Sequence, residues 1–100
     1  MQQLKYLGVP VWMNGQNYYI PSLSTRDFRN FYEALTAPAD RTDVLGAFDK
    51  YIPIIGAAIR RNYPEVTDDQ LGEWLDLHTF RKAIQAVQDA SGMTPASSGE

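Results

Sequence analysis

The chain contains no cysteine, and this absence excludes disulfide bonds, thiol chemistry and zinc sites built on thiolates. It also lacks a run of about 20 apolar residues, the length that a membrane-spanning helix requires. The longest apolar stretch, YIPIIGAAI at residues 51–59, is short and contains a proline and a glycine. No basic segment followed by a long apolar run opens the sequence, so we expect no signal peptide, no membrane partner and a cytoplasmic location.

An excess of positive charge is also missing. The chain has 9 Lys and Arg residues against 12 Asp and Glu residues, which gives a net charge of −3. Because nucleic-acid-binding proteins gain much of their affinity by neutralising phosphates, this balance argues against a nucleic-acid partner. No glycine-rich phosphate loop, nucleophile elbow, zinc-protease motif or pair of catalytic carboxylates is recognisable. We therefore expect a protein that is not an enzyme, with no catalytic residues, no cofactor and no metal.

What the sequence does contain is enough apolar material for one small domain. Hydrophobic residues make up 44% of the 100 residues and charged residues 21%, as in an ordinary globular protein. The last residues, MTPASSGE, are small and polar and include a proline. We expect a single domain over residues 1–92 and a disordered tail over residues 93–100.

A β-hairpin is predicted near the amino terminus by the stretch VPVWMNGQNYYIP, residues 9–21. Asn14 and Gly15 suit the two positive-φ positions of a type I′ turn, and β-branched and aromatic residues flank them. Pro10 has no N–H to donate to a strand ladder, so it belongs at an edge or at the start of a strand. Because an isolated hairpin is only marginally stable in water, its apolar face must rest on another element.

Helical periodicity dominates the rest of the chain. The first predicted helix is capped by Ser24 or Thr25 and closes at Pro38. Its buried face is formed by Phe28, Phe31, Tyr32 and Leu35. A second helix is expected from near Thr42 to Arg61, and it contains Pro53. Proline inside a helix removes a hydrogen bond, so we expect either a kink or two short helices joined at residues 51–52.

Two further helices follow. Thr67 and Gln70 have the spacing of a capping box, which predicts the start of a helix that runs to His78. Thr79 is expected to cap the last helix, which ends near residues 90–92. The predicted fold is therefore mainly α, of the α+β class, with an N-terminal β-hairpin packed on a small bundle of about four helices.

Few polar residues form a pattern that suggests a site. Asp69, Glu73 and Asp76 are spaced to share a helix face and could hold a hard cation, but such a face is ordinarily a solvated one. His78 is the single histidine, and no nucleophile or orienting partner accompanies it. We expect it at the carboxyl end of a helix, close to the last carbonyl groups.

The segment YIPIIGAAI is unusual for a helix because its apolar residues cover more than one face. Tyr51, Ile52, Ile54 and Ile55 are too broadly distributed for a single buried stripe. Two interpretations remain open: the helix is covered on two sides, or part of it is exposed and binds a partner. Trp74 is also open to two interpretations, as a core residue or as an anchor for a partner.

The carboxyl-terminal half of the chain resembles the tail assembly chaperones of long-tailed, siphovirus-type bacteriophages. The similarity covers residues 57–93, AAIRRNYPEVTDDQLGEWLDLHTFRKAIQAVQDASGM. It consists of a helix that ends in basic residues, a Tyr-Pro turn, a threonine that opens a short acidic helix, a Leu-Asp-Leu step and a final helix that ends in Ser-Gly. The spacing of these features carries the similarity, and no single motif is diagnostic.

The resemblance implies a small helical protein that binds the tape measure protein, keeps it soluble and helps to recruit tail tube subunits. Self-association is a plausible companion property, because exposed apolar surface also pairs with itself. The family has no catalytic residues, and its binding surfaces are apolar. On this chain we expect the protein-binding residues to be Tyr51, Ile54, Ile55 and Trp74.

A second hypothesis from a different class is a small DNA-binding regulator. It would use a helix-turn-helix formed around Tyr63 and Pro64, with Arg60 and Arg61 contacting phosphates. The acidic helix that begins at Asp68 stands against this hypothesis, because a recognition helix needs basic or neutral groups at that place.

Overall fold

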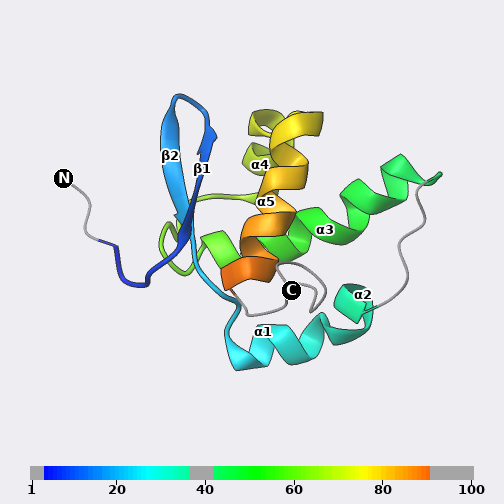
Figure 1. Ribbon diagram of the computed structural model, residues 1–100, viewed down its shortest axis with the longest axis horizontal. Helices are drawn as coiled ribbons and strands as arrows, with labels where there is room; N and C mark the ends of the chain where they lie inside the picture. The colour runs from blue at the N-terminus through cyan, green and yellow to red at the C-terminus, as the bar shows by residue number, and fades with distance from the viewer. Residues whose placement is uncertain (1–3, 37–41, 91–100) are drawn as a thin grey trace, which may run out of the picture.

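The structure is a computed structural model that describes residues 4–36 and 42–90. In these two ranges the chain forms one two-stranded antiparallel sheet and five helices, which confirms the α+β class with an N-terminal hairpin (Figure 1). The elements are β1 (Val9–Met13), β2 (Gln16–Ile20), α1 (Thr25–Asn30), α2 (Tyr32–Thr36), α3 (Val44–Ile59), α4 (Asp68–Trp74) and α5 (Leu77–Ala90). The predicted tail over residues 93–100 and the predicted helix end at Pro38 lie outside the described residues.

The hairpin forms where the sequence predicted it. Asn14 and Gly15 both have positive φ angles, of 52° and 79°, and they connect the two strands. The register pairs Val11 with Tyr18, and Pro10 lies opposite Tyr19. Alternate residues face inward, so one face of the hairpin packs against α5 while the other remains exposed. The inward-facing buried residues are Val11, Met13, Tyr18 and Ile20.

The segment after α3 joins the hairpin to the helices. Asn62 is buried, and its side-chain oxygen accepts hydrogen bonds from the N–H groups of Lys5 and Tyr6 at 3.1 and 2.8 Å. Its Nδ2 donates to the carbonyl oxygens of Tyr6 and Tyr19 at 3.0 and 2.9 Å. The hydroxyl of Tyr63 accepts a hydrogen bond from the N–H of Tyr19 at 3.0 Å. The RRNYP stretch, residues 60–64, therefore connects the end of α3 to the hairpin and to the segment before it.

The long helix α3 runs through Pro53 without interruption. Its N-cap is Asp43, whose carboxylate accepts a hydrogen bond from the N–H of Gly46 at 2.8 Å. The alternative of two short helices is thus wrong. Pro53 cannot donate to the carbonyl of Asp49, but Asp49 is exposed, so water can satisfy that carbonyl group.

The first predicted helix is divided into two short helices. Phe31 breaks it, with φ −103° and ψ 9°, between α1 and α2. The break leaves Phe28, Phe31 and Leu35 partly buried against the core but leaves Tyr32 52% exposed. Neither short helix contains a fully buried residue, so α1 and α2 form the least buried pair of elements, below α3 in Figure 1.

The boundary between the last two helices differs from the prediction. The capping box of Thr67 and Gln70 is confirmed, with both of its hydrogen bonds present. However, α4 ends at Trp74, and the cap of α5 is Asp76, whose carboxylate accepts a hydrogen bond from the N–H of Thr79 at 2.8 Å. Thr79 is therefore in the first turn and is not the cap. His78 is exposed in the first turn of α5, so it lies at the amino end of a helix and not in a last turn as predicted.

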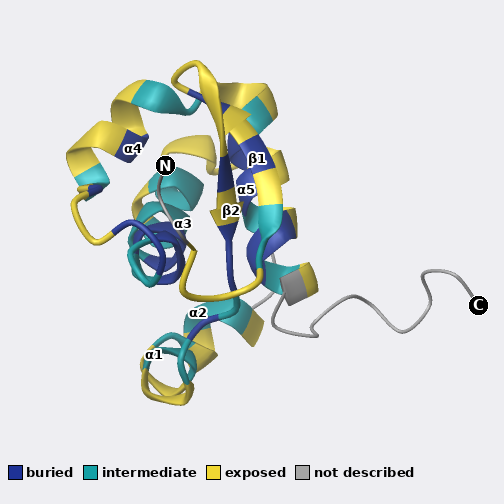
Figure 2. Cartoon of the chain, turned by 90° about the vertical axis from the view of Figure 1, so that its left-hand side faces the viewer, coloured by how far each residue is buried: buried dark blue, intermediate teal, exposed yellow. Residues whose placement is uncertain are grey.

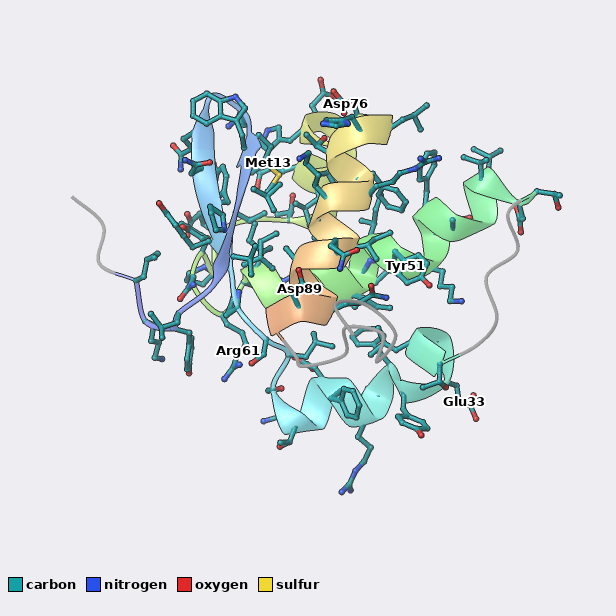
Figure 3. All side chains as sticks on the ribbon, viewed as in Figure 1. Met13, Glu33, Tyr51, Arg61, Asp76 and Asp89 are labelled. Carbon is teal, nitrogen blue, oxygen red and sulfur yellow. The ribbon has the colours of Figure 1, made fainter. Side chains whose placement is uncertain are left out.

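The core lies where the hairpin, the carboxyl-terminal half of α3 and α5 meet (Figure 2). Figure 3 shows Met13 extending from the hairpin toward α5. Across residues 4–36 and 42–90, no helix is both long and apolar enough to cross a bilayer. The largest fully buried side chains include Ile20, Ile54, Ile55, Ile59 and Leu71.

Candidate protein-binding groove

Two of the four residues expected to bind a partner are core residues. Ile54 is 1% exposed and Ile55 is 0% exposed, so in this structure neither lies at a surface where a partner could reach it. The reason is that α3 is covered on two sides, since it contacts β2 as well as α4 and α5. The first of the two interpretations of YIPIIGAAI is therefore correct for its carboxyl-terminal part, and the placement of Ile54 and Ile55 on a docking surface is wrong.

The other two expected residues are partly buried and lie in separate aromatic clusters. Trp74 stacks on Tyr18, with ring centroids 5.3 Å apart and planes at 27°. Tyr51 makes an edge-to-face contact with Phe80 at 6.5 Å, and the ammonium group of Lys50 lies 5.1 Å from the Tyr51 ring centroid. The structure thus does not bring the four predicted residues together as one surface.

An open apolar depression lies instead between the amino-terminal half of α3 and the junction of α4 with α5. We call it the α3–α5 groove. Its volume is about 340 Å³, within the range of about 300–1,000 Å³ that is usual for ligand sites. At its base the rings of Phe48 and Phe80 meet edge to face, 4.8 Å apart. The lining residues are Phe48, Ile52, Gly72, Leu75, Asp76, Leu77 and Phe80.

Exposed leucine and valine side chains extend the apolar surface beyond the α3–α5 groove. Leu45 is 73% exposed and Val44 is 51% exposed, one helical turn before Phe48 on α3. Leu77, in the first turn of α5, is 65% exposed. Figure 1 shows the cause: the amino-terminal half of α3 projects beyond α5, so nothing in the described residues covers this end of its apolar stripe.

The sequence contains a signal for this surface, although the predicted binding residues lie closer to the carboxyl end of the helix. Val44, Leu45, Phe48 and Ile52 belong to the same 3.6-residue stripe as the buried Ile55 and Ile59. The stripe is about 24 Å long, because α3 has 16 residues and each adds about 1.5 Å. The buried residues of α3 are confined to residues 54–59, so the core covers only the carboxyl-terminal part of this stripe.

Acidic side chains lie in and near the α3–α5 groove. Asp76 lines it, and its pKa lies below the ordinary value of 3.8 because the backbone N–H and then the hydroxyl of Thr79 donate hydrogen bonds to the carboxylate. Asp69 and Glu73 are exposed on α4. The three acids do not share a helix face, because α4 ends before Asp76. Within the part of the chain that the structure describes, no group of His, Asp or Glu side chains is arranged to hold a metal ion.

The two arginines of the DNA-binding hypothesis make contacts within the protein. Arg60 donates from Nη1 to the carbonyl of Val66 at 3.1 Å and forms an ion pair with Asp68 at 3.0 Å. The guanidinium of Arg61 lies 4.0 Å from the Tyr6 ring centroid, and its Nη1 donates to the carbonyl of Ser22 at 2.8 Å. These contacts favour a structural role for both arginines over a role in phosphate binding.

Comparisons with models of protein families, with curated protein sequences and with solved structures give no match to this chain. They add no function to what the geometry suggests. The α3–α5 groove offers shape and apolar area, and the carboxylate of Asp76 lies at its edge. Such a surface is suited to hold part of another molecule.

Proposed function

We propose that this protein is a non-catalytic chaperone that holds an apolar helix of another protein in the α3–α5 groove. In its specific form, the proposal is that of a bacteriophage tail assembly chaperone. It would bind the tape measure protein and help to recruit tail tube subunits in the cytoplasm of the bacterial host. The observation that carries the proposal is the open groove, together with the exposed Leu77 that lines it and the exposed Leu45 one turn before Phe48.

A helix is the occupant that best fits this geometry. Amphipathic helices bind grooves by inserting apolar side chains spaced three and four residues apart. The stripe from Val44 to Ile52 covers about two helical turns, or about 12 Å, and Leu77 lies across the groove from it. Because α3 and α5 contact each other through Phe48 and Phe80, a third helix would lie over the open side of the groove and insert its apolar side chains into it. The resemblance of residues 57–93 to tail assembly chaperones points to the long helical tape measure protein as that partner.

Co-expression with a tagged tape measure protein from the same genome tests the proposal. We expect the wild-type chain to co-purify with it, and we expect the double variant Leu45→Asp, Leu77→Asp to be lost from the complex. Both leucines are mostly exposed, so the double variant should keep a cooperative thermal melt.

Leu7 provides a matched control for the double variant. It is 97% exposed, and it lies in the segment before β1, on the opposite side of the molecule from the amino-terminal half of α3 (Figure 1). Leu7→Asp should leave capture of the tape measure protein unchanged. Co-purification of the Leu45→Asp, Leu77→Asp variant at the wild-type level would refute the proposed groove.

A further inference from the structure

We infer that the helix that binds the α3–α5 groove carries lysine or arginine side chains beside its apolar stripe, so that its partner is a cationic amphipathic helix. This inference rests on the proposed function and adds the chemistry of the partner to it. It follows from the charges on the two sides of the groove and from the absence of a side chain at Gly72.

Three aspartates, which we call the groove acids, either line the groove or lie within one helical turn of a residue that lines it. Asp76 lines the groove directly. Asp69 precedes Gly72 by three residues on α4, which places it one turn away on the same side of the helix. Asp49 lies three residues before Ile52 on α3. All three are exposed, and none has an ion-pair partner among residues 4–36 and 42–90.

The basic side chains offer little compensation. On α5, Arg81 is exposed one turn after Leu77, and His78 makes the smallest of the contributions that lower the pKa of Asp76, so two basic side chains stand against the three groove acids. Arg60 is paired with Asp68, and Lys50 lies over the ring of Tyr51. A partner with cations on the side that faces α3 and α4 would therefore gain attraction from the groove acids, whereas a partner with carboxylates there would be repelled.

Gly72 leaves a gap in the wall between two of the groove acids. A Cβ atom built at Gly72 would meet no heavy atom within 4 Å, so a partner side chain can approach the α4 backbone there. Asp69 lies one helical turn before this gap, and Asp76 follows Gly72 by four residues, beyond the end of α4. A partner helix that places an apolar side chain against Gly72, with a cation on either side of that side chain, would match both the shape and the charge of this wall.

Two labelled peptides of about 18 residues, or about five helical turns, test the inference with the full chain. Both carry the same leucine stripe, and the flanking positions are lysine in one and glutamate in the other. By fluorescence anisotropy at low salt we expect the lysine peptide to bind roughly tenfold more tightly, the sum of two or three exposed ion pairs. Because salt screens such pairs, the ratio should fall toward one at about 1 M salt.

Substitutions of the groove acids show whether they cause the preference. The variant Asp49→Asn, Asp69→Asn should reduce the ratio of the two affinities to about threefold or less. The control Glu33→Gln removes an exposed carboxylate on α2, far from Asp76 in Figure 3, and should leave the ratio unchanged.

The possible results separate the inference from the proposed function. If both peptides bind equally and both are lost in the Leu45→Asp, Leu77→Asp variant, the groove binds helices but the inference about charge is wrong. If neither peptide binds, both the inference and the helix-binding groove are refuted. A dimer of the chain that depends on Leu45 and Leu77 and excludes both peptides, seen by sedimentation, would also refute the inference, because a second copy would then occupy the groove.

Discussion

Asn62 shows how much of this fold depends on one polar side chain. It is 4% exposed and forms hydrogen bonds with backbone groups of Lys5, Tyr6 and Tyr19. A buried backbone group without a partner costs about 1–3 kcal/mol, so the side chain stabilises both the segment before β1 and the hairpin. The sequence predicted a turn at this place but not the partners of Asn62, because they lie 43 to 57 residues away along the chain.

Asp76 leads to a prediction about pH. Its pKa is lowered in the folded protein by hydrogen bonds from Thr79. The ionised carboxylate therefore stabilises the fold above the unfolded pKa, and this contribution is lost as the pH falls through the folded pKa. We expect the wild type to be more stable than Asp76→Asn at pH 6, and we expect the difference to shrink as the pH falls below about 4.

Urea denaturation of both proteins between pH 6 and pH 2.5 measures this difference. Asparagine is also a good N-cap residue, so the variant keeps the start of α5 and removes only the titrating group. All other carboxylates titrate in both proteins, and their effects cancel in the comparison. A stability difference that stays constant over this range would show that the ionisation of Asp76 does not contribute.

At the scale of helices and strands, local signals predicted the elements well and their boundaries less well. The Asn14-Gly15 turn and the capping box of Thr67 depend on neighbouring residues only, and both are present. The end of α4 was misplaced because the apolar spacing of Leu71 and Trp74 continues to His78. Nothing in that periodicity distinguishes the predicted helix boundary at His78 and Thr79 from the observed one at an Asp76 cap.

Two glycines allow opposite predictions for the same substitution. A Cβ atom at Gly8 would lie 2.7 Å from backbone carbon atoms of Tyr19 and Ile20, so Gly8→Ala should destabilise the hairpin by about 1–3 kcal/mol. At Gly72, within α4, a Cβ would meet nothing within 4 Å. Gly72→Ala should therefore stabilise the protein by about 0.5–1 kcal/mol through its higher helix propensity.

Urea denaturation midpoints of the two alanine variants provide the measurement. The two substitutions add the same methyl group, so each serves as the control for the other. Equal changes in the two free energies of unfolding would contradict the close approach of Gly8 to β2.

For the whole molecule, the sequence established that apolar residues exceed one helical stripe but not which of them are covered. That depends on how the hairpin and α5 are placed around α3, and this placement comes from contacts between distant segments. The carboxyl-terminal half of α3 is enclosed by β2, α4 and α5, while Val44 and Leu45 remain exposed at the other end. The candidate binding surface therefore lies on the predicted helix, but its residues Phe48 and Ile52 lie about two turns and one turn before the predicted Ile55.

Ile54 and Leu45 test this arrangement of the whole molecule. Ile54 is 1% exposed, so Ile54→Asp removes core packing worth about 2–5 kcal/mol and also places a carboxyl group in an apolar site. Against a total stability of about 5–15 kcal/mol, this loss should abolish the cooperative thermal melt. Leu45→Asp makes the same chemical change at a site that is 73% exposed, and it should change the stability by no more than about 0.5 kcal/mol. Circular dichroism melts of the two variants compare them directly. A cooperative melt near the wild-type temperature for Ile54→Asp would mean that α3 is not enclosed, and it would return Ile54 to the list of residues that can bind a partner.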